Sequence, residues 1–185
     1  MYIREAYGWV VIRDIMEQFE VKRGLIKKVD GEGGLSSIAN QYFEGVKTTK
    51  NKGIEGHYGI LTNVKAYYSD EGKLVVDVQQ LKGNELEDFL SKDNGRQEAM
   101  ESRKRWSGFL DVATGYNAKQ RGDKAKENAK KASKARSGIN QARKFMEMAK
   151  NISDEKIAEA EALILDIEKE LEMGNNTRAH SLTSK

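Results

Sequence analysis

The sequence predicts an α+β protein, with a small antiparallel sheet of about four strands covered by a short and a long helix, and then a C-terminal α-helical hairpin. Three observations predict this class. Short alternating runs typical of strands lie between residues 19 and 80. A long apolar stripe at helical spacing follows from residue 95, and two charged stretches with three- and four-residue apolar spacing close the chain. Since the chain has no proline, long uninterrupted helices and glycine-built turns are expected.

Four runs predict the strands, at residues 19–22, 54–60, 62–68 and 73–80. In the last run Leu74, Val76 and Val78 share one face, because successive side chains of a strand point to opposite sides. Asp70-Glu71-Gly72, before that run, has the composition of a hairpin turn with glycine at positive φ. A meander that is polar on one side needs helices to cover the other.

Two helices are available to cover the sheet. The first is predicted at residues 35–43, with Ser36 or Ser37 as its N-cap. The second is predicted at residues 95–113, and its bulkiest apolar residues, Trp106, Phe109 and Leu110, are expected in the core. Gly115 is expected at the left-handed position that ends this helix.

The C-terminal part is predicted to be a charged helical hairpin over residues 119–173, with a disordered tail at 174–185. Ser153 is the expected N-cap of its second arm. Residues 119–150 hold 11 Lys and Arg against 3 Asp and Glu, whereas residues 151–172 hold 2 against 8. A basic arm therefore faces an acidic one, as in a two-stranded coiled coil.

Composition excludes several kinds of site. There is no cysteine, and the two histidines, His57 and His180, are far apart in the sequence, so neither a metal site nor a cofactor is predicted. The apolar run at residues 9–12 is too short for a signal peptide, and no stretch is long enough for a membrane span. A cytoplasmic protein without membrane contact is expected.

Three stretches resemble one small archaeal family, a domain of unknown function of about 100 residues. They are Lys22-Arg23-Gly24 after the first strand, Tyr58-Gly59 followed by Gly72-Lys73-Leu74-Val75-Val76, and Phe109-Leu110 with Thr114-Gly115-Tyr116 and Lys119-Gln120-Arg121. The resemblance covers roughly residues 16–125 and implies a compact α+β fold, an archaeal cytoplasm, and no assigned activity; the α+β domain is predicted at residues 16–118. The hairpin at 126–172 departs from the family pattern. Because the family resemblance starts near Met16, that residue is the expected initiator, and residues 1–15 the expected extension.

Features that suggest catalysis have simpler interpretations. Asp30-Gly31-Glu32-Gly33-Gly34 could cradle phosphate before a helix, but it lacks the Walker lysine and carries acids, so a plain turn is favoured. His57 could be a general base, although a strand-surface histidine is favoured. Acidic residues between Glu85 and Asp93 could bind a metal, but helix-start residues are favoured. No enzyme is predicted.

Basic residues interleaved with aromatic ones favour a non-catalytic binding module, with RNA or a ribonucleoprotein as partner. The predicted phosphate or stacking contacts are Lys22, Arg23, Arg103, Arg105, Tyr116, Lys119 and Arg121. The alternative is a protein–protein interaction or dimerisation module that acts through residues 126–172.

One observation separates the nucleic-acid-binding hypothesis from the protein-interaction alternative, namely whether the acidic arm covers the basic one. If Glu161, Glu168 and Glu172 pair with Lys130, Arg136 and Arg143, little positive field remains for nucleic acid.

Overall fold

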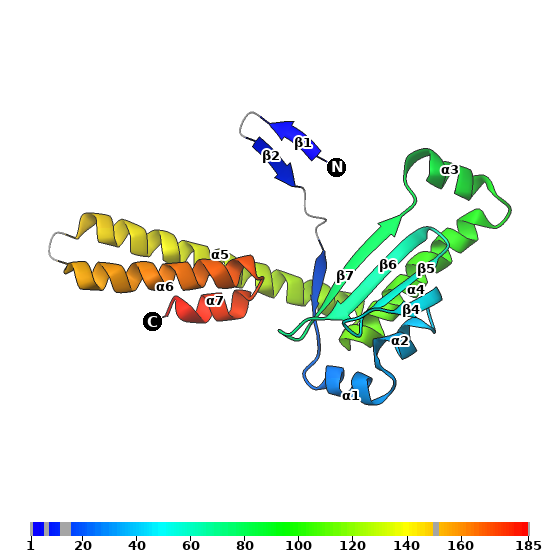
Figure 1. Cartoon of the computed structure of the whole chain (residues 1–185), viewed down its shortest axis with the longest axis horizontal. Coiled ribbons are helices and arrows are strands. Elements are labelled where there is room, and N and C mark those ends of the chain that lie inside the picture. The colour runs from blue at the N-terminus through cyan, green and yellow to red at the C-terminus, as the bar shows by residue number, and fades with distance from the viewer. Residues whose placement is uncertain (1, 6–7, 12–15, 150–151, 185) are drawn as a thin grey trace. The chain divides into compact units, whose positions relative to one another are not determined.

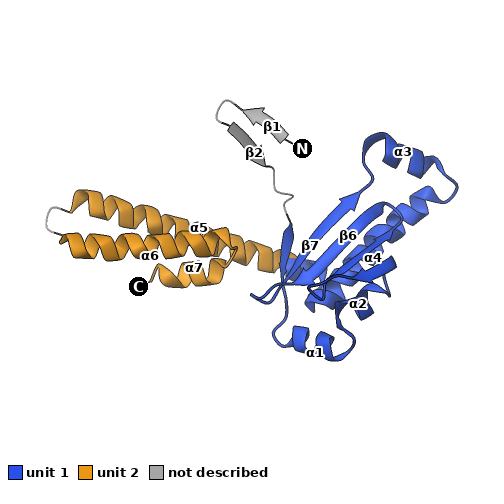
Figure 2. Cartoon of the chain, viewed as in Figure 1, with its two compact units in different colours: residues 1–121 blue, residues 122–185 orange. Residues whose placement is uncertain are grey.

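A computed structural model describes residues 2–5, 8–11, 16–149 and 152–184, with side chains from residue 16 onward. The chain divides into two compact units, residues 1–121 and 122–185 (Figure 2). At the N-terminus β1 (Tyr2–Glu5) pairs antiparallel with β2 (Gly8–Val11). No helix in the described part of the chain has both the length and the apolarity to cross a bilayer.

The main sheet of the first unit has five antiparallel strands in the order β3-β7-β6-β5-β4 (Figure 1). They are β3 (Glu17–Glu20), β4 (Glu44–Thr48), β5 (Ile54–Tyr58), β6 (Leu61–Tyr68) and β7 (Lys73–Gln80). The α+β class is confirmed, but the sheet has five strands rather than four. The additional strand, β4, gives little alternation signal because a bulge between Glu44 and Lys47 interrupts its pairing.

The two faces of the sheet differ, although Val75, on the face opposite Leu74 and Val76, is also buried. Leu74 and Val76 of β7 are buried, and they lie across from Phe19 and Glu17 of β3. On the other face Lys65 of β6 forms an ion pair with Glu55 of β5 at 3.8 Å. Gly72, at φ +77°, supplies the positive φ of the β6–β7 turn.

Four helices of the first unit follow strands of the sheet or lie against it. They are α1 (Leu25–Gly31), α2 (Gly34–Ala39), α3 (Gly83–Ser91) and α4 (Gly95–Thr114). The turn expected at residues 30–34 in fact includes the end of α1, which was not predicted. The serine cap of α2 is wrong, because Gly33 occupies the N-cap position at φ +96°. Ser36 instead donates a hydrogen bond to the Gly33 carbonyl.

The core of this unit lies between the sheet and α2 and α4 (Figure 1). Phe109 is fully buried and its ring centroid lies 5.1 Å from that of Phe43 and 5.9 Å from that of Trp106. Phe109 and Leu110 are core residues, as predicted, while Trp106 is half-buried. This aromatic cluster fixes α4 on the sheet and thereby positions the basic residues of α4.

The second unit is a helical hairpin with a third, short helix. Its helices are α5 (Ala118–Met148), which begins in the first unit, α6 (Asp154–Glu172) and α7 (Asn176–Leu182). The Ser153 side chain accepts a hydrogen bond from the Lys156 amide, which confirms the predicted N-cap. The disordered tail is wrong, since α7 occupies most of it and Ala179 is fully buried.

Candidate nucleic-acid interface

The junction between α4 and α5 is fixed by backbone hydrogen bonds and capping side chains. Gly115 adopts φ +72° and ends α4, and the Lys22 amide donates to the Thr114 carbonyl at 2.9 Å. Asn117 and Gln120 form a reciprocal capping box, in which each side chain accepts from the other residue's amide at 2.9–3.0 Å. The junction therefore starts α5 in a defined way and brings Lys22 next to Gly115.

Arg121 belongs to this junction rather than to an external surface. Its side chain is 8% exposed, forms an ion pair with Asp111, and donates to the Tyr116 carbonyl at 2.6 Å. Because these partners enclose the guanidinium, little of Arg121 is open to an external phosphate. Tyr116 is half-buried beside it.

Arg105 is likewise held by its own domain. Its guanidinium lies 3.9 Å from the centroid of the Tyr58 ring. Its nitrogens also contact a Glu101 carboxylate oxygen and the Tyr42 carbonyl oxygen, each at 3.3 Å. The cation–π contact and the ion pair hold Arg105 within its own unit, while about a third of its side chain stays exposed.

The remaining predicted residues do not form one patch. Arg103 lies in a hollow of about 270 Å³ with Trp106 and the β7 residue Asp77. It precedes Gly115 by twelve residues, which is roughly 18 Å along α4. Lys22, Arg23 and Lys119 are exposed. The structure thus brings Lys22 to the junction but leaves Arg103 and Arg105 elsewhere.

A row of exposed lysines on α5 was not among the predicted contact residues. Lys126, Lys130 and Lys134 are exposed and follow one another at four-residue steps, so they share one side of the helix. Among the described residues none of the three forms an ion pair or a side-chain hydrogen bond. In the sequence, the four-residue spacing of Lys126, Lys130 and Lys134 is the signal that could have indicated this row.

Glu127, an acidic residue between Lys126 and Lys130 on α5, already forms ion pairs with other lysines. Glu127 pairs with Lys131 at 2.8 Å and with Lys124 at 3.1 Å. Hydrogen bonds from these two lysines lower the pKa of Glu127, because they stabilise its ionised form. Glu127 is therefore paired with lysines outside the row of Lys126, Lys130 and Lys134.

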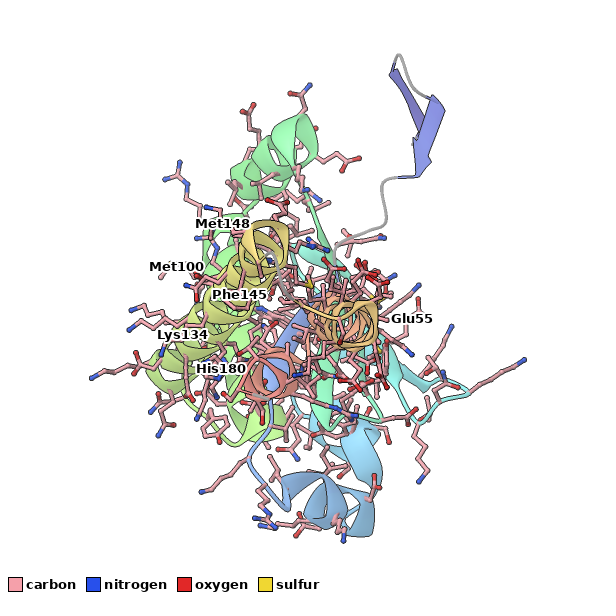
Figure 3. All side chains as sticks on the ribbon, turned by 90° about the vertical axis from the view of Figure 1, so that its left-hand side faces the viewer. Glu55, Met100, Lys134, Phe145, Met148 and His180 are labelled. Atoms are coloured by element: carbon pink, nitrogen blue, oxygen red, sulfur yellow. The ribbon has the colours of Figure 1, made fainter. Side chains whose placement is uncertain are left out.

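The acidic arm does not cover the lysine row. Among the described residues, Arg143 is the only one of Lys130, Arg136 and Arg143 that forms an ion pair with α6, with Glu168 at 2.8 Å. Figure 3 shows Lys134 extending from α5 away from α6 and α7. Charge on this hairpin is therefore segregated rather than neutralised.

An exposed aromatic side chain lies on the same side of α5. Phe145 is 64% exposed and follows Lys134 by eleven residues, which is three helical turns and leaves the two side chains about 20° apart around the axis. Met148, 74% exposed, lies one turn further (Figure 3). Lysines and an aromatic ring are thus combined on one helix face.

Comparison with known proteins concerns mainly the first unit. A family model described as a domain of unknown function (DUF5611) matches residues 16–127. The chain belongs to the DUF5611 family. No curated protein and no solved structure matches it. The DUF5611 match includes the α4–α5 junction and Lys126 but stops before Lys130 and Lys134, so most of the lysine row lies outside it.

Proposed function

We propose that this chain binds RNA through the exposed face of α5 formed by Lys126, Lys130, Lys134 and Phe145. The observation that carries the proposal is the row of three lysines, which have no acidic partner among the residues that the structure describes. When lysine side chains bind the phosphates of a nucleic acid, the counterions condensed on that nucleic acid are released, and this release drives association.

The geometry suits a single strand lying along the helix. Four residues correspond to about 6 Å of helix, so consecutive lysines of the row can meet consecutive phosphates of an extended strand. The exposed Phe145 ring supplies a platform on which a base can stack. Lys144, also exposed, would add a further phosphate contact beside it.

The binding residues change from the earlier set. Arg105 and Arg121 are occupied by internal partners, so they are removed from the proposed interface. Lys22 and Lys119 are exposed and are retained as secondary contacts on the first unit. No catalytic role is proposed for any of them.

The test is fluorescence anisotropy with a labelled mixed-sequence single-stranded RNA, measured at several salt concentrations. The triple variant Lys126→Glu, Lys130→Glu, Lys134→Glu should bind much more weakly. Loss of three phosphate contacts should flatten the slope of log K against log salt by about 2. Phe145→Ala should weaken binding with little change in that slope, because stacking releases no counterions.

The matched control is Lys27→Glu, Lys47→Glu, Lys50→Glu, which makes the same change in net charge at exposed lysines of the first unit. It should retain the wild-type salt slope. Equal weakening by both triple variants would show attraction to net charge alone and would end the proposal. DNA of the same sequence serves as a second probe, and tighter binding to DNA would make RNA the wrong ligand.

A further inference from the structure

The third helix covers one side of the α5–α6 hairpin and leaves the other side open. Lys131 donates to Thr177 at 3.1 Å and Gly138 lies against Thr183, so these α5 residues mark the side toward α7. Arg136 and Asn140 are each two residues from Gly138, which places them about 200° around the helix from it. The end-on view in Figure 3 shows α7 on one side of α5 and α6.

The open side contains a groove with an apolar floor and charged walls. The groove has a volume of about 550 Å³. Ile139 and Leu171 form its floor, and Arg136, Asn140, Arg143, Glu168 and Glu172 line the rest. Among the described residues Arg136 and Glu172 form no ion pair, although they carry opposite charges. Both a free cation and a free carboxylate are therefore available on the same surface.

Two stripes flank this groove at the spacing of a helix–helix seam. On α5 the stripe is Arg136, Asn140, Arg143 and Glu147, and on α6 it is Glu161, Leu165, Glu168 and Glu172. Both follow steps of four, three and four residues, the step pattern of residues that face a neighbouring helix. Leu165 is 66% exposed, so a large apolar side chain stands in the middle of the acidic stripe without cover.

We infer that this open face pairs with the same face of a second copy of the chain. In a two-fold interface the same surface of each copy meets the other, and each contact is made twice. Such a surface must therefore carry both the protruding or charged group and the pocket or opposite charge that receives it. This face has both: Leu165 of one copy enters the Ile139–Leu171 groove of the other, and Arg136 of one meets Glu172 of the other. Opposite charges on the rim set the register.

The pairing is independent of RNA binding because it uses another side of α5. Lys126, Lys130 and Lys134 lie roughly 80°, 120° and 160° around the helix from Arg136. A dimer would leave both lysine rows exposed, and two rows on one particle would bind a long RNA with avidity.

The experiment is sedimentation velocity of the full chain without RNA, over a range of protein concentrations. The wild type should change from monomer to dimer as concentration rises. Leu165→Glu should raise the dimer dissociation constant at least about tenfold, because the leucine is then missing from the groove. Met148→Glu is the matched control, since it also replaces an exposed apolar residue by Glu, but on the lysine side of α5, and it should leave the dissociation constant unchanged.

A charge exchange tests the register and guards against a misfolded variant. Arg136→Glu and Glu172→Arg should each weaken the dimer, and the double variant should restore it. A wild-type chain that stays monomeric up to its solubility limit would overturn the inference. So would a dimer that survives both Leu165→Glu and the single charge changes, because the copies would then meet elsewhere.

Discussion

At the scale of single residues, the contact between Gly59 and Ser102 holds the β5–β6 turn against α4. Gly59, at φ +52°, connects β5 to β6 and lies against Ser102. The buried Ser102 hydroxyl accepts from the Ile60 amide at 3.2 Å and donates to the Glu98 carbonyl at 2.7 Å. This close approach joins the β5–β6 turn to α4, and only a residue without Cβ permits it.

Gly59→Ala should destabilise the chain more than Gly24→Ala. Both positions have positive φ, which costs about 1–2 kcal/mol for alanine. At Gly24 nothing lies within 4 Å of an added Cβ, whereas at Gly59 the Cβ would overlap the Ser102 hydroxyl. Disruption of that buried hydroxyl should add about 1–3 kcal/mol. Urea unfolding measures both losses, and equal losses would contradict the packing explanation.

Tyr68 gives the first unit a pH-dependent contribution to stability. Its hydroxyl donates to the Ala113 carbonyl at 2.8 Å. Burial raises the pKa of Tyr68, with a smaller effect of the Asp30 charge. The folded state therefore disfavours the phenolate more than the unfolded state does.

The stability advantage of the wild type over Tyr68→Phe should depend on pH. It should be fully present below the unfolded-state tyrosine pKa, about 10, and should fall as pH rises above that value. The sign follows because the unfolded state releases the proton first. Urea unfolding of both proteins between about pH 8 and pH 11 measures the difference. A constant difference over that range would contradict the burial of this hydroxyl.

At the scale of elements, the capping box of α5 is the feature that starts the longest helix. Asn117→Ala removes the acceptor of the Gln120 amide and should cost about 1 kcal/mol. Lys119→Ala, an exposed position in the same turn, should change stability by less than about 0.5 kcal/mol. Thermal unfolding followed by circular dichroism compares the two. Equal effects would show that the box does not stabilise α5.

Elements with strong local signals were predicted from the sequence, and those held by distant contacts were not. The strands β5, β6 and β7, the helix α4 and the Ser153 cap have alternation, apolar stripes or capping residues in the sequence itself. The helix α7 depends on tertiary contacts, such as Arg178 with Glu170 at 3.0 Å, which no local pattern reveals. The short α3 was not predicted, although Leu86, Phe89 and Leu90 stand at helical spacing and pack against the core of the first unit.

The same distinction explains the site. Exposure of Lys22 and Lys119 agrees with their positions in the sequence, but the partners of Arg105 could not be foreseen. Its contact with Tyr42 joins residues 63 apart. Composition indicated a basic arm, whereas only the structure shows which of its lysines lack acidic partners.

At the scale of the whole molecule, the two units have separate and unequal cores. The first core contains sixteen buried residues, including Phe109, Ile54 and Leu74. The second has five: Ala135, Ile139, Ile164, Ile167 and Ala179. Since burial of apolar area provides most of the stabilising free energy, the hairpin unit should be much the weaker.

The full chain should therefore unfold in two steps in urea. Trp9→Phe leaves Trp106 as the single tryptophan, and its fluorescence reports the first unit. The part of the helical circular dichroism that comes from the hairpin unit, where α5 and α6 lie, should be lost at a lower urea concentration than the fluorescence signal changes. Coincident transitions would mean that the two cores unfold as one.

Separation of charge between the arms of the hairpin has a practical consequence. The total charge of +3 and the isoelectric point near 8.9 describe a mildly basic protein. A resin, however, interacts with one face at a time. A basic α5 and an acidic α6 should let the chain adsorb to both cation and anion exchangers at neutral pH, so its retention will follow the surface it presents rather than its isoelectric point.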